Sequence, residues 1–179
     1  MKKIFILGLV VLLVGGTAFG FITLKAADFS PTDSDFKRIY GGGMTYGVEL
    51  SFAFAKSFEL WIGASAFSKK GKSSYTREET SVSLIPIGGG VKWRMMPGKR
   101  VSPYVAVGLE YVLYTESNVI GDVSAGGVGF TGKGGVDVHL AKFLGIDAYV
   151  AYSSCSMKPA DFRFNVGGLE LGAGIDFIF

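Results

Sequence analysis

The last segment of the chain, residues 164–179, alternates apolar and polar side chains, and this period of two restricts the possible fold more than any other feature. Only Ile178 breaks the pattern. One face of such a strand can contact lipid while the other faces a polar interior. The ending therefore predicts the closing strand of a membrane β-barrel. The apolar set is Leu169, Leu171, Ala173, Ile175, Phe177 and Phe179, and the intervening set is Glu170, Gly172, Gly174 and Asp176.

The beginning of the chain has the three-part layout of a secretory signal peptide. Residues 1–3 are positively charged, residues 4–14 form an apolar run, and small residues flank a cleavage point after Gly20. The alternative is an uncleaved membrane anchor, because apolar character continues beyond that point. The glycines that dilute the run favour the signal peptide. We therefore expect a signal peptide at 1–20 and one barrel domain at 21–179.

The composition supports a membrane barrel. The chain is 49% hydrophobic with a mean hydropathy of +0.38, yet no apolar run after residue 24 is long enough for a spanning helix. Lipid cannot satisfy an open sheet edge, so a closed barrel remains. The 27 glycines are about twice the usual share of roughly 7%, and those inside apparent strands permit the bending that a narrow barrel needs.

Charge and cysteine content exclude other classes. Without Lys2 and Lys3 the mature chain would carry 16 basic and 15 acidic residues, a near-neutral balance without the signature of nucleic-acid binding. Cys155 is the only cysteine, so no internal disulfide is expected. It falls in a segment that we expect to be a polar loop.

Alternation predicts eight strands, at residues 21–29, 39–54, 58–67, 80–94, 101–114, 127–141, 144–153 and 164–179. In the second strand Tyr40 belongs to the outward set. In the fourth, Pro86 predicts a bulge or a register change because proline cannot donate to a ladder. Trp61, Tyr104 and Tyr149 are predicted to point inward as fillers.

The connections alternate in length. Longer polar links fall at 30–38, 68–79, 115–126 and 154–163, and short ones at 55–57, 95–100 and 142–143. Outer-membrane barrels have long extracellular loops and short periplasmic turns, and an even strand number places both termini in the periplasm. The predicted fold is an all-β, eight-stranded antiparallel up-and-down barrel.

The chain resembles the small eight-stranded outer-membrane β-barrel domain family of Gram-negative bacteria. Residues 29–36 leading into residues 40–43 are similar to the first-loop region of such proteins, and Gly174, Phe177 and Phe179 match their C-terminal assembly signal, although Gly172 departs from its polar position. The resemblance implies an outer-membrane protein inserted by the barrel-assembly machinery after escort by periplasmic chaperones, in contact with outer-membrane lipid and lipopolysaccharide. It implies no activity. We expect a monomer.

The predicted lumen contains charges of both signs. One interpretation is mutual pairing that fills a narrow core, which we favour because unpaired buried charges are costly. The other is a polar path or ligand pocket. The lumen set is Lys25, Glu49, Glu59, Lys92, Arg94, Glu110, Lys133, Asp137, His139, Asp147, Glu170 and Asp176.

An enzyme is not expected. Some outer-membrane barrels modify lipid, but His139 is the only histidine, and Ala141 replaces the serine of the deacylase His-x-Ser pattern. The alternation also points His139 away from lipid. No catalytic residue, cofactor site or metal site is predicted.

The second long link is basic and is the candidate binding surface. It could contact lipopolysaccharide phosphates or a partner, or it could be a solvated run of charge. We therefore expect a role in envelope structure or surface binding, with a narrow pore for small solutes or ions as the alternative. The basic set is Lys69, Lys70, Lys72, Tyr75 and Arg77.

Overall fold

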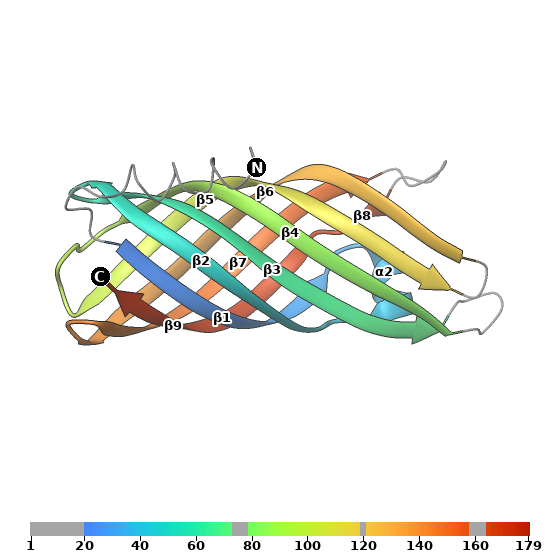
Figure 1. Ribbon diagram of the computed structural model, residues 1–179, viewed down its shortest axis with the longest axis horizontal. Helices are drawn as coiled ribbons and strands as arrows, with labels where there is room; N and C mark the ends of the chain where they lie inside the picture. Colours follow the sequence, from blue (N-terminus) through green and yellow to red (C-terminus); the bar gives the residue numbers. More distant parts are fainter. Residues whose placement is uncertain (1–19, 73–78, 119–120, 158–163) are drawn as a thin grey trace, which may run out of the picture.

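The computed structural model describes residues 20–72, 79–118, 121–157 and 164–179. Eight long antiparallel strands form a closed barrel, with one short helix and a two-residue strand at one end (Figure 1). The elements are β1 (Gly20–Pro31), α2 (Ser34–Tyr40), β2 (Gly43–Ala55), β3 (Phe58–Lys72), β4 (Glu79–Arg94), β5 (Val101–Asn118), β6 (Gly121–Ala141), β7 (Leu144–Met157), β8 (Phe164–Asn165) and β9 (Gly168–Ile178).

The sheet closes by pairing its first and last long strands. β9 pairs with both β1 and β7, and each of the other long strands pairs with its neighbours in the chain. At the seam the Gly20 N–H donates to the Phe179 carbonyl at 3.0 Å, and the Phe179 N–H donates to the Gly20 carbonyl at 3.1 Å. Closure gives the backbone N–H and C=O groups at the strand edges hydrogen-bond partners within the sheet, as a lipid environment requires. The predicted eight-stranded barrel is confirmed.

The predicted alternation of faces is confirmed in the long strands. Outward side chains are apolar and exposed, as at Val128 (68% exposed) and Leu171 (70%), whereas inward Ser51 and Ser102 are fully buried. A soluble β-sheet protein buries its apolar side chains and exposes its polar ones. This barrel does the reverse, as expected of a barrel surrounded by lipid. Among the described residues, no helix is long and apolar enough to cross a membrane.

Several strands extend beyond the expected ends. The predicted link at 115–126 is wrong, because β5 continues to Asn118 and β6 begins at Gly121, with Thr115 paired to Ser124. The ladder continues into polar sequence because backbone pairing does not require lipid-facing side chains. β7 also extends, to Met157, so Cys155 lies in a strand and is 1% exposed rather than in a polar loop.

The first long link contains a helix that the sequence analysis missed. Asp33 caps α2, because its carboxylate accepts from the N–H groups of Asp35 and Phe36, both at 3.0 Å. Gly41, with a φ of 66°, ends it. The expected second strand therefore begins at Gly43 rather than at residue 39, and Tyr40 is buried in the helix instead of facing outward.

Pro86 leaves the strand register unchanged, so the expected bulge or register change is wrong. β4 pairs with β3 through Ile87 with Ala64 and resumes in the same register with Leu84 and Phe67. Two residue pairs are skipped between these points. On the other side Pro86 itself pairs with Val112 of β5. The proline thus interrupts one ladder locally without shifting it.

Bulky inward side chains lie against glycines on neighbouring or next-but-one strands. Trp61, Tyr104 and Tyr149 are all buried, as predicted for fillers. A Cβ added at Gly108 would lie 2.4 Å from Cζ2 of Trp61 and 2.5 Å from the Gly89 carbonyl oxygen. Corresponding close approaches join Tyr104 to Gly135 and Tyr149 to Gly172. The glycines therefore make room for aromatic rings in a narrow lumen.

We predict that Gly108→Ala destabilises the folded barrel by about 1–3 kcal/mol, because the methyl group would overlap Trp61 and a backbone oxygen. Urea unfolding of the refolded protein in lipid vesicles measures the loss. Gly132→Ala is the matched control, since a Cβ there meets nothing within 4 Å. Equal stability of the two variants would contradict the close-packing explanation.

Candidate functional site

The barrel interior is divided into layers along its axis. The end that holds Gly20 and Phe179 is called the turn end, and the end that holds α2 is called the loop end (Figure 1). From the turn end to the loop end lie a turn-end cluster, a central charge network, a cavity and an apolar core. Each layer takes side chains from several strands, so the sheet closure determines which groups meet.

The turn-end cluster is centred on Arg94 of β4. Its guanidinium donates to both carboxylate oxygens of Glu59, at 2.5 and 3.2 Å, and also to Asp137. The guanidinium carbon lies 4.6 Å from the centre of the Phe21 ring. All three charged side chains are at least 95% buried. A bidentate pair with a second acceptor satisfies most donors of this arginine.

The central charge network is organised by Glu49 of β2. Lys25 and Lys92 approach its carboxylate at 2.7 and 2.9 Å, and Lys133 contacts it as well. Each lysine also lies over an aromatic ring: Lys25 over Tyr149 at 4.7 Å, Lys92 over Tyr104 at 4.6 Å and Lys133 over Trp61 at 3.5 Å. Carboxylate and ring together replace water around the buried ammonium groups.

Asp147 of β7 extends this network. The Tyr104 hydroxyl donates to its carboxylate at 2.9 Å, and the Lys25 ammonium lies 3.8 Å away. Lys92 also donates to the Ser51 hydroxyl at 3.2 Å. The network therefore links side chains from strands all around the lumen. It fills this part of the lumen and crosslinks the strands.

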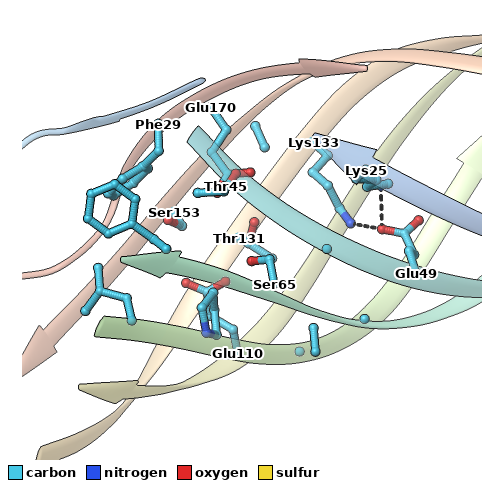
Figure 2. Close-up of a pocket in the computed structure, with 18 of the residues that line it drawn as sticks. Lys25, Phe29, Thr45, Glu49, Ser65, Glu110, Thr131, Lys133, Ser153 and Glu170 are labelled. Atoms are coloured by element: carbon cyan, nitrogen blue, oxygen red, sulfur yellow. Dashed lines mark hydrogen bonds and ion pairs between the residues drawn. The ribbon is translucent and has the colours of Figure 1, made fainter. Parts of the chain in front are cut away.

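A cavity of about 100 Å³ lies between the central charge network and the loop end (Figure 2). Glu110 of β5 and Glu170 of β9 point into it from different strands, and neither has a hydrogen bond or ion pair with another described residue. The expected mutual pairing therefore does not include these two carboxylates. The serine and threonine residues that line the same cavity are Thr45, Ser65, Thr131 and Ser153.

An apolar core lines the cavity toward the loop end. α2 contributes Phe36 and Tyr40 to it, and β8 packs Phe164 against it. We call this set the loop-end core. Its buried members are Phe29, Phe36, Tyr40, Phe67, Val82, Leu84, Val112, Tyr114, Cys155, Met157 and Val166.

Polar contacts fix α2 over this core. The Tyr40 hydroxyl donates to Glu116 at 2.6 Å, and burial, followed by that hydrogen bond, raises the pKa of the Tyr40 phenol. The phenol therefore stays protonated and remains a donor. The second carboxylate oxygen of Asp33 accepts from the Asn165 N–H at 3.3 Å. Asp33 thus caps the helix and ties it to β8.

Exposed basic side chains lie on α2 and at the end of β3. Lys69 and Lys70 are exposed at the end of β3, as are Lys37 and Arg38 on the helix. The position of a Cβ on Gly43 is 3.3 Å from the Lys69 ammonium, so this lysine lies near the residues that follow α2. We call Lys37, Arg38, Lys69 and Lys70 the basic rim.

The sequence analysis found only part of the basic rim. Lys72 belongs to β3, but its side chain lies outside the described residues, as do Tyr75 and Arg77. Lys37 and Arg38 were missed because residues 30–38 were expected to be a loop. The signal that could have found them is the capping residue Asp33, followed by the helical segment Ser34–Tyr40.

The predicted assembly-signal residues lie at the seam. Phe177 and Phe179 face outward and are exposed, whereas Gly174 faces the lumen, where a Cβ would lie 2.7 Å from Thr23. His139 faces inward and stacks on Phe21, with ring centres 6.1 Å apart. Within the described ranges, no group of three or more His, Cys, Asp or Glu side chains is arranged to hold a metal ion.

Comparison with known proteins gives a family match. A sequence model described as "Outer membrane protein beta-barrel domain" matches residues 12–177. No curated protein sequence matches the chain.

Solved structures share the fold. Neisserial surface protein A (NspA) is 17% identical, with a TM-score of 0.70 and coverage of 89% of this chain and 97% of that chain. OprG from Pseudomonas aeruginosa is 16% identical (TM-score 0.67; 90% and 96%). Ail of Yersinia pestis, in complex with the heparin analogue sucrose octasulfate, is 16% identical (TM-score 0.58; 89% and 99%). At these identities the likeness shows the fold alone.

We predict that Glu49→Ala destabilises the barrel by about 3–5 kcal/mol, because it leaves three buried ammonium groups without their shared carboxylate. Urea unfolding in lipid vesicles is again the measurement. Asp35→Ala is the control, because its ion pair with Arg38 is exposed and its loss should stay within about 1 kcal/mol. A loss for Glu49→Ala no larger than that of the control would contradict the central role of Glu49.

Proposed function

The chain belongs to the outer membrane protein β-barrel domain family, and from this premise we propose that it is a non-enzymatic, closed barrel that acts through its loop end. The observation that carries the proposal is the filled lumen. The central charge network and the loop-end core lie on either side of the cavity, and their packing supports a blocked axis. In eight-stranded barrels side chains can fill the interior.

The proposed orientation puts the turn end in the periplasm and the loop end outside the cell. The two longest connections between long strands, from β1 to β2 through α2 and from β7 to β9 through β8, lie at the loop end and support it, although β5 and β6 are joined there by residues 119–120 alone. In this orientation Phe179 lies on the periplasmic side, where the barrel-assembly machinery would bind the end of β9. The protein would be a monomer, with its apolar outer face in lipid. Cleavage after Gly20 remains a prediction; β1 begins at that residue.

The proposed binding surface is the basic rim, and the proposed partners carry phosphate or sulfate groups. The rim combines two cations of α2 with two of β3, and within it only Arg38 has an ion pair with a described residue. Arginine and lysine bind such anions by charge-assisted hydrogen bonds. Ail, which has the same fold, was crystallised with a sulfated heparin analogue. Lipopolysaccharide phosphates and sulfated glycans share this chemistry.

We predict that the refolded protein does not conduct ions in planar bilayers, because a solute would have to pass two blocked layers. Stepwise conductance would support the alternative of a narrow pore. A variant with Lys25, Lys92 and Lys133 replaced by Met together with Glu49→Leu gives the control for the recording. If the wild type conducts in reproducible steps that this apolar variant lacks, the closed-barrel proposal is wrong.

We predict that changing the four basic-rim residues to Gln weakens binding to vesicles containing lipopolysaccharide, or to heparin, by about 10-fold or more, because each exposed charge lost near an anionic surface costs up to about 1 kcal/mol. Sedimentation with vesicles and retention on heparin distinguish the two partners. Lys56→Gln with Lys142→Gln, two exposed lysines at the turn end, is the control. Equal binding of both variants would show that the basic rim is not the binding surface.

A further inference from the structure

The cavity between the central charge network and the loop-end core contains two carboxylates that form no ion pair with a described residue. Glu110 of β5 and Glu170 of β9 point into it (Figure 2), and Glu170 is close enough for its charge to act on Glu110. Two like charges that face the same buried space repel each other, and the repulsion is stronger inside a protein than in water. The pair therefore favours a positively charged occupant.

The charge balance of the whole lumen has the same sign. The lumen set contains seven carboxylates and four basic side chains, and all of them belong to the described part of the chain. With the histidine uncharged, this is an excess of three negative charges. Buried charges without partners are costly. A bound divalent cation would remove two of the three.

The lysines beside the cavity are held by another carboxylate. Lys25 and Lys133 line the cavity, but the Lys25 ammonium lies 2.7 Å from Glu49, and Lys133 contacts the same carboxylate. Among the described residues, neither lysine forms an ion pair with Glu110 or Glu170. The counter-charge for these two glutamates is therefore left to a bound ion.

A third group without a partner lines the same cavity. Trp61 of β3 is only 6% exposed, and its indole Nε1 has no hydrogen-bond partner among the described residues. Buried N–H groups are nearly always hydrogen-bonded, so this donor indicates an acceptor such as water. A cavity of about 100 Å³ has room for about three water molecules at about 30 Å³ each. Thr45, Ser65, Thr131 and Ser153 complete its polar lining.

We propose that Glu110 and Glu170 bind one partly hydrated divalent cation, Ca²⁺ or Mg²⁺, in this cavity. Such cations take carboxylate and water oxygens as ligands. The ion cancels the charge of the two glutamates and links β5 to β9 from inside the barrel. Its water molecules accept the Trp61 N–H and fill the space beside the serine and threonine residues. The site lies within the lumen and is independent of the basic rim.

Terbium(III) tests the site directly, because it binds at oxygen-ligand calcium sites and emits light when a nearby tryptophan is excited. The chain has two tryptophans, Trp61 at the cavity and Trp93, which is exposed on the outer face. The protein is refolded with Tb³⁺ in phosphatidylcholine vesicles. We expect emission on excitation of tryptophan, which Trp93→Phe keeps and Trp61→Phe loses. Excess Ca²⁺ or Mg²⁺ should displace the Tb³⁺.

The carboxylates are tested by the double variant Glu110→Gln with Glu170→Gln. We expect it to bind Tb³⁺ about 10-fold more weakly or worse, because both charged ligands become neutral. Asp122→Asn, which removes an exposed carboxylate at the loop end, is the matched control and should bind as the wild type does.

Urea unfolding with Ca²⁺ and with EDTA is the second measurement. Ca²⁺ should raise the midpoint of the wild type and leave that of the double variant unchanged, because a ligand stabilises only the folded state that binds it. In EDTA the double variant should be at least as stable as the wild type, since it lacks the repulsion between the two glutamates. This comparison also shows that the variant folds.

Three results would overturn the proposal. The first is a wild-type protein, refolded with Tb³⁺, that gives no emission on excitation of tryptophan. The second is equal Tb³⁺ affinity of the wild type and the double variant, which would place the ion elsewhere. The third is an emission that survives Trp61→Phe, or one that neither Ca²⁺ nor Mg²⁺ displaces.

Discussion

Closure of the sheet is the constraint on which the rest of this structure depends. In lipid every backbone donor and acceptor needs an internal partner, so the first and last strands must pair. Here the Gly20–Phe179 backbone pair ends that seam. Closing only eight strands leaves a lumen that is one or two side chains wide. Inward side chains must therefore fit closely against their neighbours, which explains the glycines beside Trp61, Tyr104 and Tyr149.

The narrow lumen is filled in two different ways. Toward the turn end, Glu49 and Arg94 each pair with more than one side chain of opposite charge. These buried ion pairs fill the lumen in place of an apolar core. Toward the loop end, aromatic and aliphatic side chains form an ordinary apolar core under α2. Buried ions are tolerated only when their partners are complete. Glu110 and Glu170, two lumen carboxylates that have no ion pair with a described residue, face the cavity between the two layers, where water can solvate them.

The sequence predicts the wall of the barrel well because alternation is local. Leu169, Leu171 and Ile175 identify the face of their strand without knowledge of any neighbour. The interior is harder to predict, since Glu49 and Lys133 are 84 residues apart and meet only through closure. The helix was missed because α2 is short and its local signal is the single capping residue Asp33, and the contact of Asp33 with Asn165, 132 residues away, cannot be seen in the sequence. Such contacts leave no periodic signal.

The interactions that stabilise the barrel also lie across its axis. A path along the axis would require Glu49 to release three lysines from different strands and the loop-end core to part above the cavity. Both changes would expose unpaired charge or apolar surface within the wall that holds the strands together. Binding at the basic rim requires neither, because Lys37, Lys69 and Lys70 already face solvent. We therefore infer that this chain can change its loop-end partners without cost to the barrel, whereas opening its lumen would weaken the fold itself.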